Sequence, residues 1–404
     1  GVDKNNNKRA ADRRPTTDQL RKSIDRSTSI AMAPPPSPLT EELIEEILVR
    51  FPADDPASLV GAALVCKPWC RLVCSQGFRR RFTEFHRRRT PVLGFFCRVR
   101  PRPSSSEEVR FVPTSPSFRR LPHAMMPNWH PVDALHGRVL LYHVVDLDLR
   151  LIVCNPITGQ VWRMPPTVPQ LQYKGWNAAL LCSSAESFRV VVVATTVDGF
   201  TSARIYSSSE HHAWGMPIAS STQRACVSTG GCVARNNDNS AVYFMCRRNY
   251  GILEYDSCKQ QLSFIGLPSQ CELEHKCIAL MTAEDGGLGF AMIDVHRDSK
   301  LFTWSRRDHN DPCNSWTQER EFDLDELFPL DVLFTPRAGA TRVVAVVNAF
   351  TDVFIGTIHG IFTVDLNLGK VTQIHHSSHS CDIRQVVPYA AFCTPVVGNC
   401  LHMS

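Results

Sequence analysis

One pattern occurs three times in the second part of the chain: IVCNPITGQVW (152–162), LEYDSCKQQLS (253–263) and FTVDLNLGKVT (362–372). In each copy an apolar run ends at Asn155, Asp256 or Asp365, and a turn leads into a second run. Asn and Asp favour such turns because their side chains hydrogen-bond the backbone a few residues on. The pattern predicts a β-hairpin at each of the three places.

Two further units lie between these hairpins, RIYSSSEHHAW (204–214) and LFTWSRRDHNDPCNSW (301–316), and each closes on a tryptophan. The anchor positions of the five units are 155, 206, 256, 304 and 365, which are 51, 50, 48 and 61 residues apart. A repeat of about 50 residues with several strands per unit is typical of a kelch-like β-propeller. Residues 91–404 have room for about six blades. An irregular pair of β-sandwiches is the alternative.

The preceding region, residues 39–77, has helical character instead. Leu39, Leu43 and Ile47 recur every four residues while glutamates occupy the other face, which predicts an amphipathic helix. Two more short helices are expected before Gly77, because prolines interrupt the apolar pattern. Three short helices are too small to hold much of a core alone, so the unit is expected to need a partner.

The stretch LTEELIEEILVRFPADDPASLVGAALVCKPWCRLVCSQGFRRRF (39–82) resembles the F-box, the module that binds the Skp adaptor of cullin–RING ubiquitin ligases. It has the leucine-rich helix of that family, a Phe-Pro pair at 51–52 and a Val-Cys-Lys-x-Trp element at 65–69. It departs from the family pattern at Thr40 and Cys70, neither of which is an apolar docking position.

The resemblance implies docking on a Skp-family adaptor and, through it, on a cullin–RING ligase. The residues expected to bind the adaptor are Leu39, Leu43, Ile47, Leu48, Pro52, Leu59, Val65, Cys66 and Trp69. Two interpretations of Trp69 remain open. It can anchor an interface, because aromatic side chains in desolvated pockets dominate binding energy, or it can fill the small core.

The downstream region resembles the F-box-associated propeller domains of plants, particularly of grass F-box proteins. The resembling stretches are NPITGQVWRMPP (155–166), EYDSCKQQLSFIGLP (254–268), GIFTVDLNLGKV (360–371) and VVPYAAFCTP (386–395). The expected protein is α+β and multidomain, with a disordered, Pro-rich tail (1–38), a three-helix F-box (39–86) and an all-β propeller of about six blades (91–404).

The function implied is that of a substrate-recognition subunit, in which the propeller binds an unknown target protein and the ligase transfers ubiquitin to it. An adaptor-binding scaffold without a degraded substrate is one alternative, and a propeller enzyme is another. The sequence contains no nucleophile elbow, phosphate-binding loop, dinucleotide fingerprint or metalloprotease helix, so we expect no catalysis and no cofactor.

The distribution of charge and the length of the apolar runs indicate which classes of partner are not expected. The formal net charge of +5 hides +4 in residues 1–31 and +8 in 79–102, with −7 over the rest. Nucleic-acid-binding proteins more often carry one basic face with interleaved aromatics, so no nucleic-acid partner is expected. The apolar runs are strand-sized and the first 31 residues carry no secretory signal, which predicts no membrane partner and a cytoplasmic or nuclear location.

Two clusters of potential metal ligands occur in the sequence. Cys66, Cys70 and Cys74 share a helical face, and His375, His376, His379 and Cys381 lie close together. Neither set has the spacing of a structural zinc site, so no metal is expected, and the cysteines are interpreted as free thiols.

Two other kinds of segment are interpreted as having no binding or catalytic role. The arginine runs 79–81 and 87–89 are expected to be solvated, although they could contact an acidic partner or act as a nuclear address. Residues 1–31 have no pattern that could fold, and Met32 directly precedes the F-box. We therefore expect translation of the functional protein to begin at Met32.

Overall fold

The computed structural model describes residues 39–53, 55–86, 90–101, 107–114, 128–146, 148–166, 173–182, 187–209, 213–220, 226–230, 233–236, 239–247, 251–271, 277–294, 299–306, 316–328, 342–347, 352–357, 359–376 and 381–392. The chain divides into two compact units, residues 1–46 and 47–404, with the boundary inside the first described helix. The expected tail, 1–38, lies outside the described residues. Within the described ranges, no helix is both long and apolar enough to cross a bilayer.

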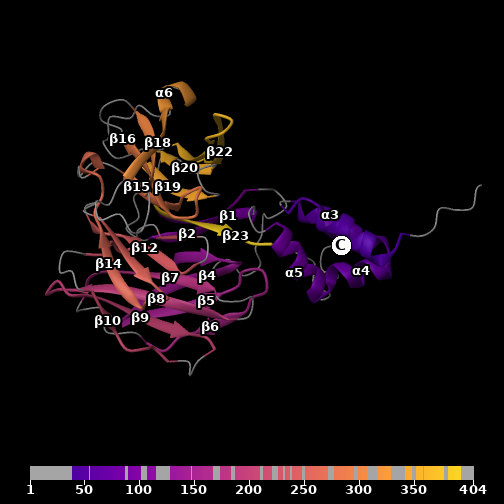
Figure 1. Ribbon diagram of the computed structural model, residues 1–404, viewed down its shortest axis with the longest axis horizontal. Helices are drawn as coiled ribbons and strands as arrows, with labels where there is room; N and C mark the ends of the chain where they lie inside the picture. Colours follow the sequence, from indigo (N-terminus) through magenta and orange to yellow (C-terminus); the bar gives the residue numbers. More distant parts are fainter. Residues whose placement is uncertain are drawn as a thin grey trace, which may run out of the picture. The chain divides into compact units, whose positions relative to one another are not determined.

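The helical region contains α2 (Glu41–Val49), α3 (Pro56–Val65), α4 (Lys67–Cys74) and α5 (Gln76–Phe85) (Figure 1). Helix α3 begins as the sequence predicts, because Pro56 occupies its first turn and the Asp55 carboxylate accepts a hydrogen bond from the Ala57 amide at 3.2 Å. Helix α5 was not expected. Its N-cap is Ser75, whose hydroxyl oxygen accepts from the Phe78 amide at 3.1 Å.

The core of helices α3 to α5 and the end of α2 is small. Its buried side chains are Leu48, Val49, Leu59, Ala62, Ala63, Val73, Cys74, Phe78 and Phe82. His86, just after α5, reaches the Val49 carbonyl oxygen at 2.8 Å and so ties the two ends of this segment together. The fourth helix contributes the two phenylalanines, which are the largest side chains of this core.

The rest of the described chain forms six antiparallel sheets (Figure 1). Sheet 1 holds β3 (His130–Leu135), β4 (Arg138–Val145), β5 (Asp148–Cys154) and β6 (Val161–Arg163). Sheet 2 holds β7 (Tyr173–Cys182), β8 (Phe188–Thr196), β9 (Thr201–Ser207) and β10 (Ile218–Ala219). Sheet 3 holds β11 (Val233–Arg235), β12 (Ala241–Met245), β13 (Ile252–Asp256) and β14 (Gln261–Ile265).

The remaining three sheets follow the same order. Sheet 4 holds β15 (Cys277–Thr282), β16 (Leu288–Asp294), β17 (Lys300–Arg306) and β18 (Trp316–Asp323), followed by the short helix α6 (Leu324–Leu327). Sheet 5 holds β19 (Arg342–Val347), β20 (Asp352–Thr357), β21 (Gly360–Asp365) and β22 (Lys370–His376). Sheet 6 combines the ends of this region, with β1 (Val92–Pro101) between β2 (Glu108–Pro113) and β23 (Cys381–Ala390).

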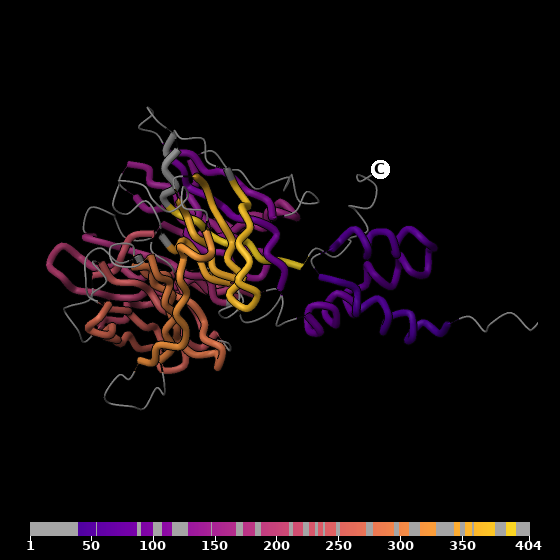
Figure 2. The backbone as a smooth tube through the Cα atoms, turned by 90° about the horizontal axis from the view of Figure 1, so that it is seen from above, coloured from indigo at the N-terminus to yellow at the C-terminus, as the bar shows by residue number. Residues whose placement is uncertain are grey.

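The ring is closed by pairing the last strand with the first. Strand β23 runs antiparallel to β1 from Val92↔Ala390 to Pro101↔Cys381, and Figure 2 shows the yellow end of the chain beside this early strand. The strands β3, β7, β11, β15, β19 and β23 each lie at the inner edge of a sheet, and they follow one another around the ring. The architecture is a six-bladed β-propeller, as the period predicted.

The hydrophobic cores confirm that the sheets are blades. Each of six buried clusters among the described residues joins two successive sheets, and the series returns to its start. One residue from each sheet of a cluster shows this: Leu140 and Val192, Val191 and Val242, Tyr243 and Phe290, Ile293 and Val353, Phe354 and Phe95, Leu93 and Val139. A blade therefore buries both of its faces only when its neighbours are present.

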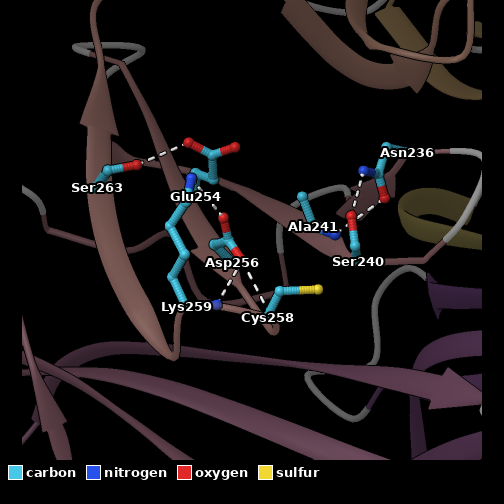
Figure 3. A network of polar contacts seen from close by, with 8 residues as sticks. All are labelled: Asn236, Ser240, Ala241, Glu254, Asp256, Cys258, Lys259 and Ser263. Carbon is cyan, nitrogen blue, oxygen red and sulfur yellow. Dashed lines mark hydrogen bonds and ion pairs between the residues drawn. The ribbon is translucent and has the colours of Figure 1, made fainter. Parts of the chain in front are cut away.

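The three predicted hairpins have the same turn. The side-chain oxygen of Asp256 accepts from the amides of Cys258 and Lys259, both at 2.9 Å, as the close view in Figure 3 shows. Asn155 and Asp365 cap their turns in the same way, at 2.8–3.1 Å. Burial disfavours ionisation of Asp256, but these amides and the Lys259 ammonium outweigh it and hold the pKa of the carboxyl below its ordinary value.

The two tryptophan-closed units also share one contact. The indole N–H of Trp214 donates to the Pro165 carbonyl at 3.0 Å, and that of Trp316 donates to the Gly266 carbonyl at 2.8 Å. In both cases the last part of one blade is tied to the segment that leaves the blade before it. The hairpin units of the sequence thus lie in sheets 1, 3 and 5, and the tryptophan-closed units lie in sheets 2 and 4 between them.

Candidate functional site

The predicted amphipathic helix α2 leaves apolar side chains in contact with solvent. Leu43 and Ile47 are 53% and 49% exposed, and Leu39, just before the helix, is 56% exposed. Residues four apart lie on one face of a helix, so Leu43 and Ile47 form one stripe. Bulky aliphatic side chains at this spacing are a candidate contact for another protein.

The end of α3 exposes a second apolar pair. Leu64 and Val65 are 70% and 65% exposed, and Cys66 directly after them is exposed as well. The sequence pattern indicated Val65 and Cys66 but missed Leu64. The signal was present, because the α3 core positions Leu59, Ala62 and Ala63 leave Leu64 on the opposite side of the helix.

The remaining predicted docking residues differ in their burial. Pro52 is exposed and Trp69 is half-buried, so Trp69 has surface available both for the core and for a partner. Leu48 and Leu59 are fully buried. Leu48 follows Ile47 by one residue, and the turn of about 100° per residue directs it inward. These two leucines lie in the small core of the helices in this conformation, and adaptor binding through them stays a prediction.

The cysteine and arginine clusters do not form a chemical centre. Cys66 is exposed, Cys70 half-buried and Cys74 buried, and the described part of the chain holds no group of three potential metal ligands. In the propeller, burial raises the pKa of the Cys97 and Cys154 thiols to about 12, which makes them poor nucleophiles.

The arginines of 79–81 lie on α5, where Arg80 and Arg81 are exposed. The second arginine run, 87–89, and His379 of the histidine cluster lie outside the described residues.

An ion pair between Asp133 of β3 and Arg235 of β11 is largely buried in the propeller. Asp133 also accepts from the Leu180 amide of β7 at 2.7 Å, and Arg235 donates to the Leu180 carbonyl at 2.9 Å. Thr282 of β15 donates to the Arg235 carbonyl at 2.7 Å. Burial raises the pKa of Asp133, and Arg235 opposes this shift. The pair links the inner strands of four successive blades, so we interpret it as structural.

Comparison with known families matches the helical region and the propeller region separately. Residues 37–81 match the family described as "F-box domain". Residues 131–397 match "F-box protein AT5G49610-like, beta-propeller", which is more than half of the chain. No curated protein matches the chain.

Solved structures show a distant likeness of fold. A chain of the nidogen/laminin complex is 7% identical, with a TM-score of 0.42, over 73% of this chain and 97% of that one. The periplasmic gluconolactonase of Pseudomonas aeruginosa is 12% identical, with a TM-score of 0.41, over 71% and 83%. A protein from Lactobacillus plantarum is 12% identical, with a TM-score of 0.40, over 70% and 82%. At this distance the likeness carries no argument about function.

Proposed function

Because the chain belongs to the F-box proteins with an AT5G49610-like β-propeller, we propose that it is the substrate-recognition subunit of a Skp–cullin–F-box ubiquitin ligase. In this role the F-box binds a Skp-family adaptor, the propeller binds a target protein, and the assembly transfers ubiquitin to the target. The chain supplies proximity and no chemistry of its own. We propose it as a non-enzymatic protein of the cytoplasm or nucleus, from a plant and of the grass type, with kelch-like blades.

The observation that carries the proposal is the exposed apolar surface inside the F-box match. Leu39, Leu43, Ile47, Leu64 and Val65 all lie within residues 37–81 and are about half exposed or more. Burying one such side chain against a partner contributes about 1.5–3 kcal/mol. Within the proposed domain boundaries, 39–86 for the F-box and 91–404 for the propeller, the adaptor contact belongs to the first domain alone.

Adaptor binding is tested with the full chain and a purified Skp adaptor by calorimetry. The double variant Leu43→Ala, Ile47→Ala removes the exposed stripe of α2 without touching the buried core, and should weaken binding at least about tenfold. Leu368→Ala is the control, because Leu368 is a leucine on the β21–β22 turn that is even more exposed, at 75%.

Equal affinity of the wild type, the double variant and the control would remove the docking assignment. A chain that binds the adaptor but changes the half-life of no cellular protein would instead be a scaffold.

A further inference from the structure

The propeller has a polar region at the end of the ring where the inner strands begin. The segment Val227–Gly230, which precedes β11, crosses this end of the second blade. Its Val227 amide donates to the Thr195 hydroxyl at 3.2 Å, and its Thr229 hydroxyl accepts from the Trp176 amide at 3.4 Å. A side chain at Gly175 would collide with the Val227 carbonyl oxygen, so the approach depends on glycine there.

The segment ends beside the sixth blade. A Cβ atom at Gly230 would lie 3.2 Å from Gln385 Oε1 and 3.7 Å from Arg98 Nη2, and Gly230 itself has a φ of +69°. Arg98 and Gln385 face each other across the β1–β23 pair. The segment therefore brings together groups from the second, third and sixth blades.

Arg98 connects this place to an aromatic row of the first and second blades. Its Nη1 donates to the Tyr142 hydroxyl at 2.7 Å, and its Nε lies 3.3 Å from a Glu107 carboxylate oxygen. The Tyr142 ring lies 5.1 Å from that of Trp176 and 5.3 Å from that of His130. Burial and the Arg98 charge lower the pKa of His130, so its ring is neutral at pH 7.

Three polar atoms of this region lack a hydrogen-bond partner among the residues that the structure describes: His130 Nδ1, Trp176 Nε1 and Gln385 Oε1. Arg98 Nε makes no hydrogen bond of good geometry either, but it forms the ion pair with Glu107. Trp176 and Gln385 are more than nine-tenths buried. Buried polar groups are nearly always hydrogen-bonded, so such a concentration needs a physical reason. The Trp176 indole nitrogen is a donor only, so it needs an acceptor.

The surrounding charge favours an anionic acceptor. Arg247 lies at the other end of the segment, with its amide bonded to the Cys226 carbonyl at 2.6 Å and its side chain beside Gly175. Lys174 directly precedes Gly175 in the chain, and both Lys174 and Arg247 are exposed. Four extended residues span at most about 14 Å, so Arg98 and Arg247 lie close enough to act on one bound chain.

Among the residues that the structure describes, two carboxylates and one apolar tip also lie at this end. Glu107 faces Arg98, and Asp198 lies on the β8–β9 turn, so the three cations are only partly offset. Val197 and Phe200 flank Asp198 on the same turn and are exposed. The turn is fixed to the segment through the Thr195 hydroxyl, which also bonds Thr201 at 3.0 Å.

We propose that this end of the propeller, around Val227–Gly230, binds an acidic and partly apolar stretch of the target polypeptide. Arg98, Lys174 and Arg247 contact its negative groups, and the Val197–Phe200 tip contacts its apolar side chains. The aliphatic side chain of Val197 and the small number of cations favour a polypeptide over a nucleic acid, whose binding more often uses a longer basic track. The inference rests on the proposed target-binding role of the propeller and gives that role a location and a chemistry.

The test measures fluorescence anisotropy of labelled peptides of roughly twelve residues, long enough to pass both cationic ends, with the full chain bound to its Skp adaptor. The probes alternate Leu with Asp and Glu, with Asn and Gln, or with phosphoserine, and single-stranded DNA of matched charge is the fourth. We expect the two anionic peptides to bind and the neutral one not to. Whichever of the carboxylate and phosphoserine peptides binds more tightly shows whether the negative groups of the target are carboxylates or phosphates.

Arg247→Gln and Lys174→Gln change exposed side chains, so the fold should stay intact, and each should weaken anionic binding about threefold to fivefold. Lys259→Gln is the matched control, because Lys259 is an exposed lysine on the β13–β14 turn. Preference for DNA, equal binding of the neutral peptide, or an equal loss in the Lys259 control would overturn the proposal. If the wild type does not bind the adaptor but the full chain alone binds the acidic peptide, the ligase role is overturned and the peptide site remains.

Discussion

The helices and the propeller leave different kinds of groups unsatisfied. In the helical region the exposed residues that call for a partner are carbon-rich, with Leu43, Ile47 and Leu64 as the clearest cases. In the propeller most apolar side chains are buried between blades, with Val197 and Phe200 among the exposed exceptions, and the buried polar atoms without a partner among the described residues include Trp176 Nε1 and Gln385 Oε1. A surface of the first kind needs an apolar partner, while one of the second kind needs a partner with charge and hydrogen-bonding groups.

The largest effect expected from this difference is on stability. Phe290 is fully buried between the third and fourth blades, where its ring packs on those of Trp304 and Trp316. Phe290→Ala should lower the free energy of unfolding by about 3–5 kcal/mol, because it removes a large side chain and leaves a cavity. Urea denaturation followed by tryptophan fluorescence measures this loss.

Leu64→Ala is the control for that variant, since it removes a large apolar side chain that is already exposed. Its unfolding free energy should stay within about 0.5 kcal/mol of the wild type. If Leu64→Ala destabilises the chain as much as Phe290→Ala does, the exposed apolar surface of the helices is part of a core, and the comparison fails.

Salt should separate the two binding surfaces next. Raising the ionic strength from low to several times physiological should weaken binding of the acidic peptide by about tenfold, because it screens contacts to Arg98, Lys174 and Arg247. Adaptor binding through Leu43 and Ile47 should change by less than about twofold, because apolar burial is not screened. Both affinities can be measured on one preparation. If salt weakens adaptor binding more than peptide binding, the adaptor surface is the charged one and the comparison is wrong.

A smaller effect is expected at the repeated turns. Asp256→Ala removes an acceptor that two amides share, and should cost about 1 kcal/mol of unfolding free energy. Asp256→Asn keeps the acceptor, as Asn155 does in the first blade, and should cost less. An equal loss in both variants would show that the charge, and not the acceptor, stabilises the turn.

The pH dependence of the same turn has a definite sign. The folded-state pKa of Asp256 lies below its ordinary value of about 3.9, so the carboxylate's contribution is fully present above that value. The contribution disappears as the pH falls through the lowered folded-state pKa. The difference in stability between the wild type and Asp256→Ala should therefore shrink only in that acidic range, which urea titrations at several pH values can follow.

The sequence predicted the blades well because their signal is local and repeated. Asn155, Asp256 and Asp365 each cap a turn through hydrogen bonds to residues two and three positions on, so the spacing alone reveals the hairpins. Helix α5 was missed because its N-cap, Ser75, is followed by Gly77 and an arginine run, which read as the end of the helical region. The phenylalanines that it buries lie among these arginines.

The sites were predictable only in part, for a different reason. Whether Leu48 or its neighbour Ile47 faces solvent depends on the exact rotation of α2 against the other helices, which the apolar pattern does not resolve. The polar end of the propeller joins Arg98, Trp176 and Gly230, which are far apart in the sequence. Such a meeting follows from the closure of the ring by β1 and β23, and no local pattern contains it.

The smallest expected effect concerns the one of the three repeated hairpins whose turn lacks glycine at the left-handed position that they share. Gln260 has a φ of +50°, while the equivalent residues of the other two hairpins are Gly159 and Gly369, with φ of +76° and +62°. A residue with a side chain loses about 1–2 kcal/mol in this conformation, and a glycine avoids that cost. Part of the stability so gained is lost again, because glycine makes the unfolded chain more flexible. Gln260→Gly should therefore raise the unfolding free energy by about 0.5–1 kcal/mol, since the Gln260 side chain is exposed. Gly369→Gln is the reciprocal variant and should lower it by a similar amount. Urea midpoints of the two variants measure both effects, and a loss of stability in Gln260→Gly would mean that the three turns are not equivalent, although they share one sequence pattern.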